Sequence, residues 1–384
     1  MREDVYIIDN LRTPVGSRNK ILKNFTAVQL AAHILEGLMS RQNIDPALID
    51  EVIMGNVVGA GAGQNLARQA SYMAGLPDHI LSYTVNHVCG SGLMALSMGM
   101  RSILSGSGDY IFAGGTESVT HSPQLLLPSN EEPQDSAFVD GLYCSMTHKS
   151  MGELAEELCQ RHQISRAQQD QFALRSHQKA VRARPSFFPE EIYPLIGDKS
   201  IVVACDDRPR LNLTLERLGL LPPVFTRTGT ITAATACTPA DGAAMLSIAS
   251  EDFVQSNKLK PKAKILGFTP IMVNPAVTFE SDTSAIERCL KQCQLELKDI
   301  DLFEITEAFA ANVILTQQIL SIPDEKLNVF GGDLALGHPL GIAGTRVLVS
   351  LINALQTRKL NKGLACISFG GGGAIAVIIE SCLS

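Results

Sequence analysis

The sequence NHVCGSG at residues 86–92 decides how this chain is interpreted, because it sets a cysteine at a sharp turn. Cys89 lies at the end of a strand pattern and just before a helix pattern that ends near Gly106. Unpaired backbone N–H groups and the positive end of the helix dipole favour a thiolate there. Gly90 and Gly92 permit the turn and the close approach of a substrate. The pattern predicts a nucleophile; the alternative is a buried cysteine beside a glycine turn.

A second turn, LGHPLG at residues 336–341, occupies the matching place later in the chain. Each turn precedes a helix pattern, a strand pattern and a run of glycines, the runs being Gly114–Gly115 and Gly370–Gly373. His338 has glycine and proline as neighbours, which lets it approach a thiol closely enough to accept its proton. A turn histidine is more often structural, but its pairing with Cys89 through the repeat favours catalysis.

The rest of the chain repeats in the same way. Strand and helix patterns alternate over residues 5–119 and again after residue 260, and IDPALIDEVI at residues 44–53 parallels LELKDIDLF at residues 295–303. This order predicts an α/β fold built from two similar halves, residues 1–257 and 258–384. Between them, residues 119–247 are rich in proline and hold two helix patterns, at residues 152–161 and 165–183. We expect this stretch to be an inserted loop domain.

Composition excludes several classes of protein. The chain has 384 residues, 45% of them hydrophobic, and a net charge of −7, with no basic run that could follow a nucleic-acid backbone. Its apolar runs are shorter than the roughly 20 residues of a membrane span. No apolar signal region opens the sequence, and its nine cysteines are irregularly spaced, which together predict a cytoplasmic protein with reduced thiols. Cys289 and Cys293 lack a second ligand pair, so we expect no metal.

Six stretches, two of them within the turns described above, identify the family that this sequence resembles. They occur in the order typical of the thiolases, which join or cleave acyl-CoA units through a cysteine thioester, and the similarity runs from residue 5 to residue 380. The stretches are Arg12–Gly16, Gln64–Ala70, Val88–Gly92, Ala113–Ser118, Glu307–Phe309 and Gly337–Pro339.

The resemblance implies a five-layer αβαβα fold, a loop domain that holds coenzyme A, and a homodimer or homotetramer. It implies that Cys89 accepts the acyl group and that His338 activates it and helps to bind the thioester oxygen. Backbone N–H groups of Cys89 and Gly370 would form a second oxyanion site. The expected activity is that of an acetyl-CoA C-acetyltransferase, with no bound cofactor and a coenzyme A thioester as the substrate.

Two catalytic positions depart from the family pattern. Thr306 stands where the family has an asparagine or histidine that positions a water, and Ser368 stands where it has a second cysteine. A thiol can exchange a proton near neutral pH, whereas an unaided hydroxyl is too weak an acid. Cys366 lies on the same face of the strand, two residues upstream, and is a poorly placed substitute.

The substrate side departs as well. Ser150 precedes Met151 where the family has histidine, and Cys237 lies in a stretch where the family has Asn-Ala-Ser-Gly. With Phe309, these residues are expected to bind the substrate. Two alternatives stay open: an enzyme that ends in hydrolysis or in transfer to another acceptor, and a weakly catalytic acyl-CoA-binding protein. The presence of both Cys89 and His338 favours an enzyme.

Overall fold

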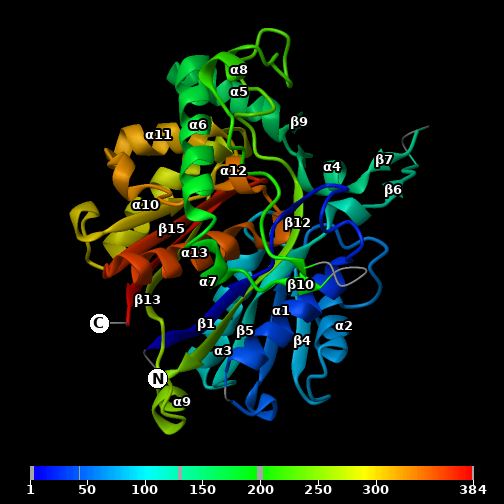
Figure 1. Cartoon of the computed structure of the whole chain (residues 1–384), viewed down its shortest axis with the longest axis vertical. Coiled ribbons are helices and arrows are strands. Elements are labelled where there is room, and N and C mark those ends of the chain that lie inside the picture. The colour runs from blue at the N-terminus through cyan, green and yellow to red at the C-terminus, as the bar shows by residue number, and fades with distance from the viewer. Residues whose placement is uncertain (1–3, 43, 129–131, 197–201, 383–384) are drawn as a thin grey trace.

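The computed structural model describes residues 4–42, 44–128, 132–196 and 202–382, and it divides into two halves that each contain a sheet (Figure 1). The strands of the N-terminal sheet run in the order β4 (Leu81–Val85), β3 (Glu51–Gly55), β5 (Tyr110–Glu117), β12 (Ala240–Ser250) and β1 (Val5–Arg12). Those of the C-terminal sheet run in the order β13 (Ala263–Met272), β16 (Gly373–Ser381), β15 (Lys362–Phe369) and β14 (Leu302–Ile305).

The two sheets meet at β1 and β13, which pair only at Tyr6 with Lys264 and at Ile7 with Ala263. Parallel pairing links β3 to β4 and β5, and β14 to β15. Every residue of β3, β5 and β12 is buried, as expected for strands covered by helices on both faces.

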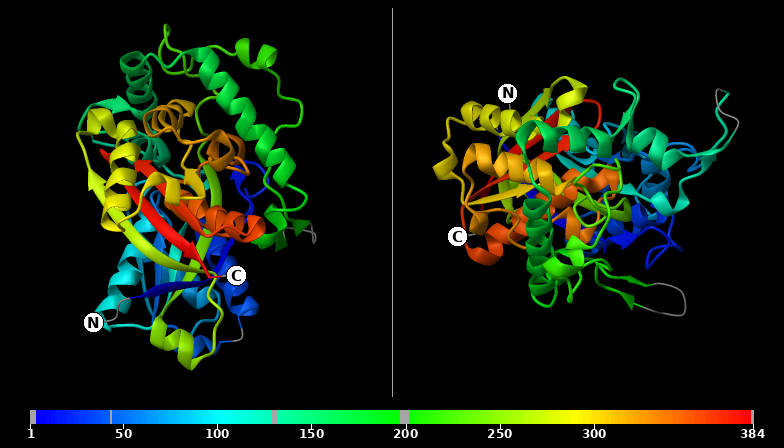
Figure 2. Two further views of the ribbon diagram at one scale, coloured as in Figure 1. Left: turned by 90° about the vertical axis from the view of Figure 1, so that its left-hand side faces the viewer. Right: turned by 90° about the horizontal axis from the view of Figure 1, so that it is seen from above.

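Helices fill the spaces around and between the sheets (Figure 2). Helices α1 (Ala27–Arg41) and α2 (Leu66–Met73) pack on the N-terminal sheet, and α10 (Ser281–Gln292) packs on the C-terminal sheet beside α11 (Ala310–Leu320). Helices α3 (Ser91–Ser105) and α13 (Ala343–Arg358) lie between the sheets and contact each other. The predicted five-layer αβαβα architecture is therefore confirmed.

The loop domain is shorter than the sequence predicts. Its main helices are α4 (Ser136–Gly141), α5 (Met151–His162), α6 (Arg166–Ala183), α7 (Phe188–Glu191) and α8 (Leu215–Gly219). Strand β12 begins at Ala240, inside the range predicted for the insertion, and pairs with β1 and β5. Its small apolar residues, ADGAAMLSIAS, form a wholly buried central strand, so the insertion ends before residue 240.

Local sequence signals account for most helix boundaries. Thr26 caps α1 through a capping box with Gln29, which fixes the start of the helix. Helix α10 begins at Ser281, and this brings Asp282 into its first turn. The segment Leu340–Arg358 is long and apolar enough to cross a membrane, but 89% of that stretch is buried inside the protein, as in a core helix.

Candidate active site

Cys89 lies in the turn between β4 and α3, and the backbone before it is strained. Val88 has a φ of 51°, a conformation that a β-branched residue rarely adopts, and its N–H is held by the Asn86 side chain at 3.0 Å. A Cβ at Gly92 would collide with Thr345 Oγ1 of α13. Glycine there lets α3 lie against α13, which brings the Cys89 turn close to the His338 turn.

A single cavity of about 220 Å³ joins most of the residues predicted from the sequence. Cys89 and His338 line it, together with Ser368 and the backbone of Gly370. The predicted substrate-binding residues that line the same cavity are Ser150, Met151, Cys237 and Phe309. The structure therefore brings together eight of the nine predicted site residues, and only Thr306 is not part of the lining.

His338 is held from behind by a buried ion pair. Its Nδ1 lies 3.2 Å from Asp333 Oδ1, and Arg346 Nη2 donates to Asp333 Oδ2 at 2.9 Å. Burial alone would raise the pKa of Asp333, but Arg346 and His338 lower it below its usual range. Asp333 is therefore ionised, and it fixes the ring so that Nε2 is left for Cys89.

The surroundings of His338 favour its charged form. Burial alone would lower the pKa of His338, but negative charge on the sulfur of Cys89 and the Asp333 carboxylate raise it well above its usual range. By contrast, burial raises the pKa of Cys237 to about 11, which keeps that thiol neutral. Cys89 is thus the thiol that is coupled to the histidine.

Glu307 ties the His338 loop to the loop domain. Its carboxylate accepts hydrogen bonds from Ser176 of α6, from Asn328, and from the Leu334 N–H two residues before the turn, at 2.7, 2.8 and 3.2 Å. Its own N–H donates to Asp333 Oδ2 at 3.0 Å. The side chain therefore supports the position of Asp333 rather than entering the cavity.

Ser368 hydrogen-bonds a second buried carboxylate. Its hydroxyl donates to Asp282 Oδ2 at 3.2 Å, and the Asn312 amide donates to the same oxygen at 2.9 Å. The Cys366 thiol donates to Asp282 Oδ1 at 3.5 Å, in keeping with its predicted place on the face that Ser368 shares. Burial raises the pKa of Asp282 to about 6, against the opposing effect of these three hydrogen bonds. Cys366 itself is fully buried and is not part of the cavity lining.

Thr306 lies just outside the cavity. Its side chain is fully buried, and its Oγ1 has no hydrogen-bond partner among the described residues. Two hydrogen bonds of 3.0 Å fix its backbone. Its N–H donates to the Cys366 carbonyl, and its own carbonyl accepts from Asn312 Nδ2. A buried hydroxyl without a protein partner is a place where a water can bind.

One side of the cavity is apolar. Phe309 packs edge-on against Phe279 and Phe225, with ring centroids 5.1 and 5.9 Å apart. Met151 begins α5, whose capping box uses the Ser150 hydroxyl and Glu153, so that hydroxyl is already engaged. Phe309, Phe279, Phe225 and Met151 therefore give the cavity an apolar wall.

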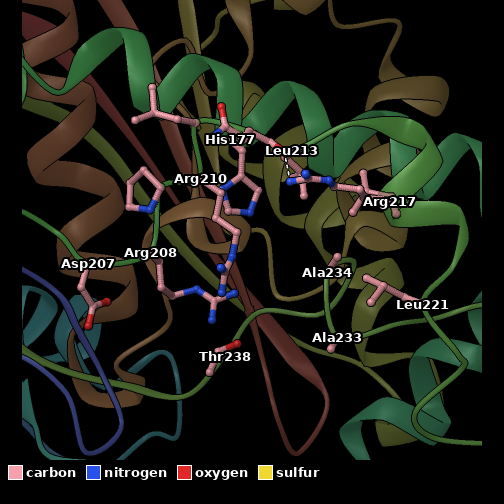
Figure 3. Close-up of a pocket in the computed structure, with 14 residues that line it drawn as sticks. His177, Asp207, Arg208, Arg210, Leu213, Arg217, Leu221, Ala233, Ala234 and Thr238 are labelled. Carbon is pink, nitrogen blue, oxygen red and sulfur yellow. Dashed lines mark hydrogen bonds between the residues drawn. The ribbon is translucent and has the colours of Figure 1, made fainter.

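A second, larger cavity of about 720 Å³ lies in the loop domain and is strongly basic (Figure 3). Arg208, Arg210 and Arg217 line it with His177, whose pKa is lowered to about 4 by burial and by Arg208 and Arg210. Arg208 Nε is buried without a hydrogen-bond partner in the described part of the chain. Thr238 lines this cavity, while its neighbours Cys237 and Pro239 line the active cavity, so the two cavities flank one segment.

Comparison with known proteins agrees with this geometry. Residues 5–252 match the family described as "Thiolase, N-terminal domain", and residues 259–381 match "Thiolase, C-terminal domain". The chain therefore belongs to the thiolase family, and it is an acyltransferase of the thiolase type.

Particular relatives cover nearly the whole chain. An acetyl-CoA acetyltransferase from Allochromatium vinosum is 38% identical over 99% of this chain and 100% of its own length. The solved acetyl-CoA acetyltransferase from Bacillus anthracis is 36% identical with a TM-score of 0.96, covering 99% of each chain. A thiolase from Ascaris suum, solved in complex with coenzyme A, is 34% identical with a TM-score of 0.94, covering 99% of this chain and 100% of its own. The binding-protein and hydrolase alternatives are not favoured by these relatives.

Three polar residues of the site, Asp333, Arg346 and Asp282, are not predicted from the sequence. Asp333 precedes His338 by only five residues, so its closeness in the chain was a usable signal. Arg346 and Asp282 lie on different helices, and nothing in their spacing relates them to His338 or Ser368.

Proposed function

We propose that this protein is an acetyl-CoA C-acetyltransferase in which Cys89 carries the acetyl group. The placement of Cys89 and His338 in one cavity, with His338 held by Asp333, is the observation that carries the proposal. Cys89 Sγ, whose proton has passed to His338, attacks the thioester carbon of acetyl-CoA. The carbon–sulfur bond then breaks, and coenzyme A leaves with that proton as its free thiol.

In the second half-reaction, C2 of another acetyl-CoA loses a proton and attacks the acetyl carbon on Cys89. A carbon–carbon bond forms, the Cys89 thioester bond breaks, and acetoacetyl-CoA is released. Backbone N–H groups of Cys89 and Gly370 would stabilise the oxygen of the acyl-enzyme, while His338 and a water at Thr306 would stabilise that of the attacking thioester.

The basic cavity of the loop domain fits the nucleotide end of coenzyme A. Its three arginines suit the phosphates, and one of them, Arg208, has a buried nitrogen with no partner among the described residues. The segment shared with the active cavity would place the thiol end near Cys89. In this proposal Met151 and Phe309 contact the acyl and pantetheine portions. No bound cofactor is required, because coenzyme A enters and leaves as a substrate.

Assembly and location belong to the same proposal. Strand β4 lies at the edge of its sheet, and apolar side chains are exposed near it, with Tyr72 at 73%, Met73 at 52% and Leu81 at 58%. A second copy of the chain would cover this edge by pairing β4 with its counterpart, giving a homodimer or a dimer of dimers. The nine free cysteines fit a cytoplasmic location.

Peptide mapping after brief mixing with acetyl-CoA tests the proposal. We expect one acetyl group on the peptide that contains Cys89, none on Cys89→Ala, and slower labelling of His338→Ala. Label that remains on Cys89→Ala would contradict the assignment of the nucleophile. An unchanged labelling rate in His338→Ala would reduce His338 to a structural role.

A further inference from the structure

We propose that Ser368 and Asp282 form a proton relay that serves the carbon–carbon bond-forming step, an inference that rests on the proposed function. Ser368 lines the cavity that contains Cys89 and His338, and its hydroxyl donates to Asp282 at 3.2 Å. A serine hydroxyl alone is too weak an acid and base for this step. A carboxylate that is hydrogen-bonded to the hydroxyl overcomes this weakness. The hydroxyl oxygen can then accept the substrate proton while its own proton passes to the carboxylate.

The relay has a defined direction. Ser368 Oγ accepts a proton from C2 of the second acetyl-CoA, and the hydroxyl proton passes to Asp282 Oδ2. The electron pair of the broken C–H bond forms the carbon–carbon bond to the acetyl group on Cys89, and the Cys89 sulfur leaves with the electrons of its thioester bond. In the reverse direction, protonated Asp282 returns the proton through Ser368 to C2.

The surroundings of Asp282 suit a group that changes its charge during turnover. The carboxyl is fully buried, and the groups that contact it are the Asn312 amide from α11 and the Cys366 thiol and Ser368 hydroxyl from β15. None of these is a cation. Burial raises the pKa of Asp282 to about 6, so near neutral pH it is ionised but can take up a proton.

Cys366 gives a matched control for the relay. It contacts the other oxygen of the same carboxylate, but it is buried away from the cavity and cannot reach a substrate. A purely structural role for Asp282 would make the Cys366 and Ser368 contacts comparable. A relay makes only the Ser368 contact essential.

The test separates the two half-reactions. Exchange of the C2 protons of acetyl-CoA with deuterated water, followed by NMR, reports the proton transfer, and acetylation of Cys89 reports the first half-reaction. We expect Asp282→Asn and Ser368→Ala each to slow exchange by about 10² to 10⁴-fold, the usual loss for a general base, with acetylation slowed less than tenfold. Cys366→Ala should slow exchange only a few-fold.

Two further readouts distinguish a relay from support of the fold. Exchange by the wild type should fall as the pH drops below about 6, where Asp282 becomes protonated, and this limb should vanish in Asp282→Asn. Ser368→Cys supplies a thiol, which can exchange a proton without the help of the carboxylate. Added to Asp282→Asn, it should therefore raise the exchange rate at least tenfold.

Equal exchange rates in Asp282→Asn and the wild type would overturn the relay, as would a failure of Ser368→Cys to rescue. If the wild-type protein is not acetylated on Cys89, the proposed function itself would be overturned.

Discussion

Two of the buried carboxylates behind the active cavity, Asp333 and Asp282, have opposite surroundings. Asp333 holds His338 and is paired with the Arg346 guanidinium, so its pKa lies below the usual range. Asp282 holds Ser368 and has amide, thiol and hydroxyl neighbours, so burial raises its pKa to about 6. A buried carboxylate beside a cation stays ionised, whereas a buried carboxyl without a cation can take up a proton.

This difference matches the two half-reactions. Acylation needs a histidine held in one orientation and tautomer, which a permanent charge at Asp333 supplies. Carbon–carbon bond formation needs a group that accepts and returns a proton, which suits Asp282. The role of a buried carboxylate therefore depends on whether a neighbouring cation or an added proton neutralises its charge.

The largest effect is expected when the fixed charge is removed. Asp333→Asn leaves Arg346 buried without its partner and lets the His338 ring turn, so we expect a loss of about 3 to 5 kcal/mol in the free energy of unfolding. Acetylation of Cys89 should slow by about 10² to 10⁴-fold. Denaturant unfolding and rapid-mixing acetylation measure the two effects.

A second variant separates stability from catalysis. Asp333→Asn combined with Arg346→Met removes both members of the pair and should recover part of the lost stability without recovering acetylation. If acetylation recovers in the double variant, the contribution of Asp333 is stability alone.

The pH dependence of stability should differ in sign between the two carboxyls. The pKa of Asp333 is lowered on folding, so its contribution is present above the unfolded value near 3.9 and is lost as the pH falls through the folded value. The pKa of Asp282 rises to about 6, so it destabilises the fold above that pH, and this cost disappears as the pH falls toward 4.

Asn variants measured across pH 4 to 8 make this comparison quantitative. Relative to the wild type, Asp282→Asn should gain up to roughly 3 kcal/mol as the pH rises from 4 to 8, the value of a shift of about two pKa units. Asp333→Asn should show no such gain. If the free energies of unfolding of the two variants changed with pH in the same way, the contrast between Asp282 and Asp333 would be wrong.

A smaller effect is expected at Thr306. Thr306→Val keeps the shape of the side chain and removes a buried hydroxyl that has no partner among the described residues, so stability should change by about 1 kcal/mol or less. If that hydroxyl holds the oxyanion water, carbon–carbon bond formation should slow by about tenfold while acetylation of Cys89 is retained. Equal losses in both half-reactions would place the hydroxyl outside the second oxyanion site.

In the basic cavity we expect an effect of similar size, confined to substrate binding. Arg210→Ala should raise the KM for acetyl-CoA by about tenfold, the value of one charge-assisted hydrogen bond to a phosphate. The KM for an acetyl-pantetheine thioester, which lacks the nucleotide, should not change. Equal effects on the two substrates would show that the cavity does not hold the phosphates.

The sequence predicted the fold and most of the cavity because the informative residues lie in turns at matching places of a repeat. Cys89 and His338 each precede a helix pattern and are flanked by glycine or proline, and such local signals can be recognised without knowledge of packing. The end of the loop domain was misplaced because the small residues of β12 resemble a loop until they are paired. Asp282 was missed because its contact with Ser368 joins the start of one helix to a strand 86 residues away.

The residue that acetyl-CoA acetylates is the most direct test of the proposed mechanism. Mass spectrometry of the digested protein, quenched within one turnover, is expected to find a single acetyl group on Cys89. An acetyl group on Cys237 or Cys366, or no acetylated cysteine at all, would contradict it.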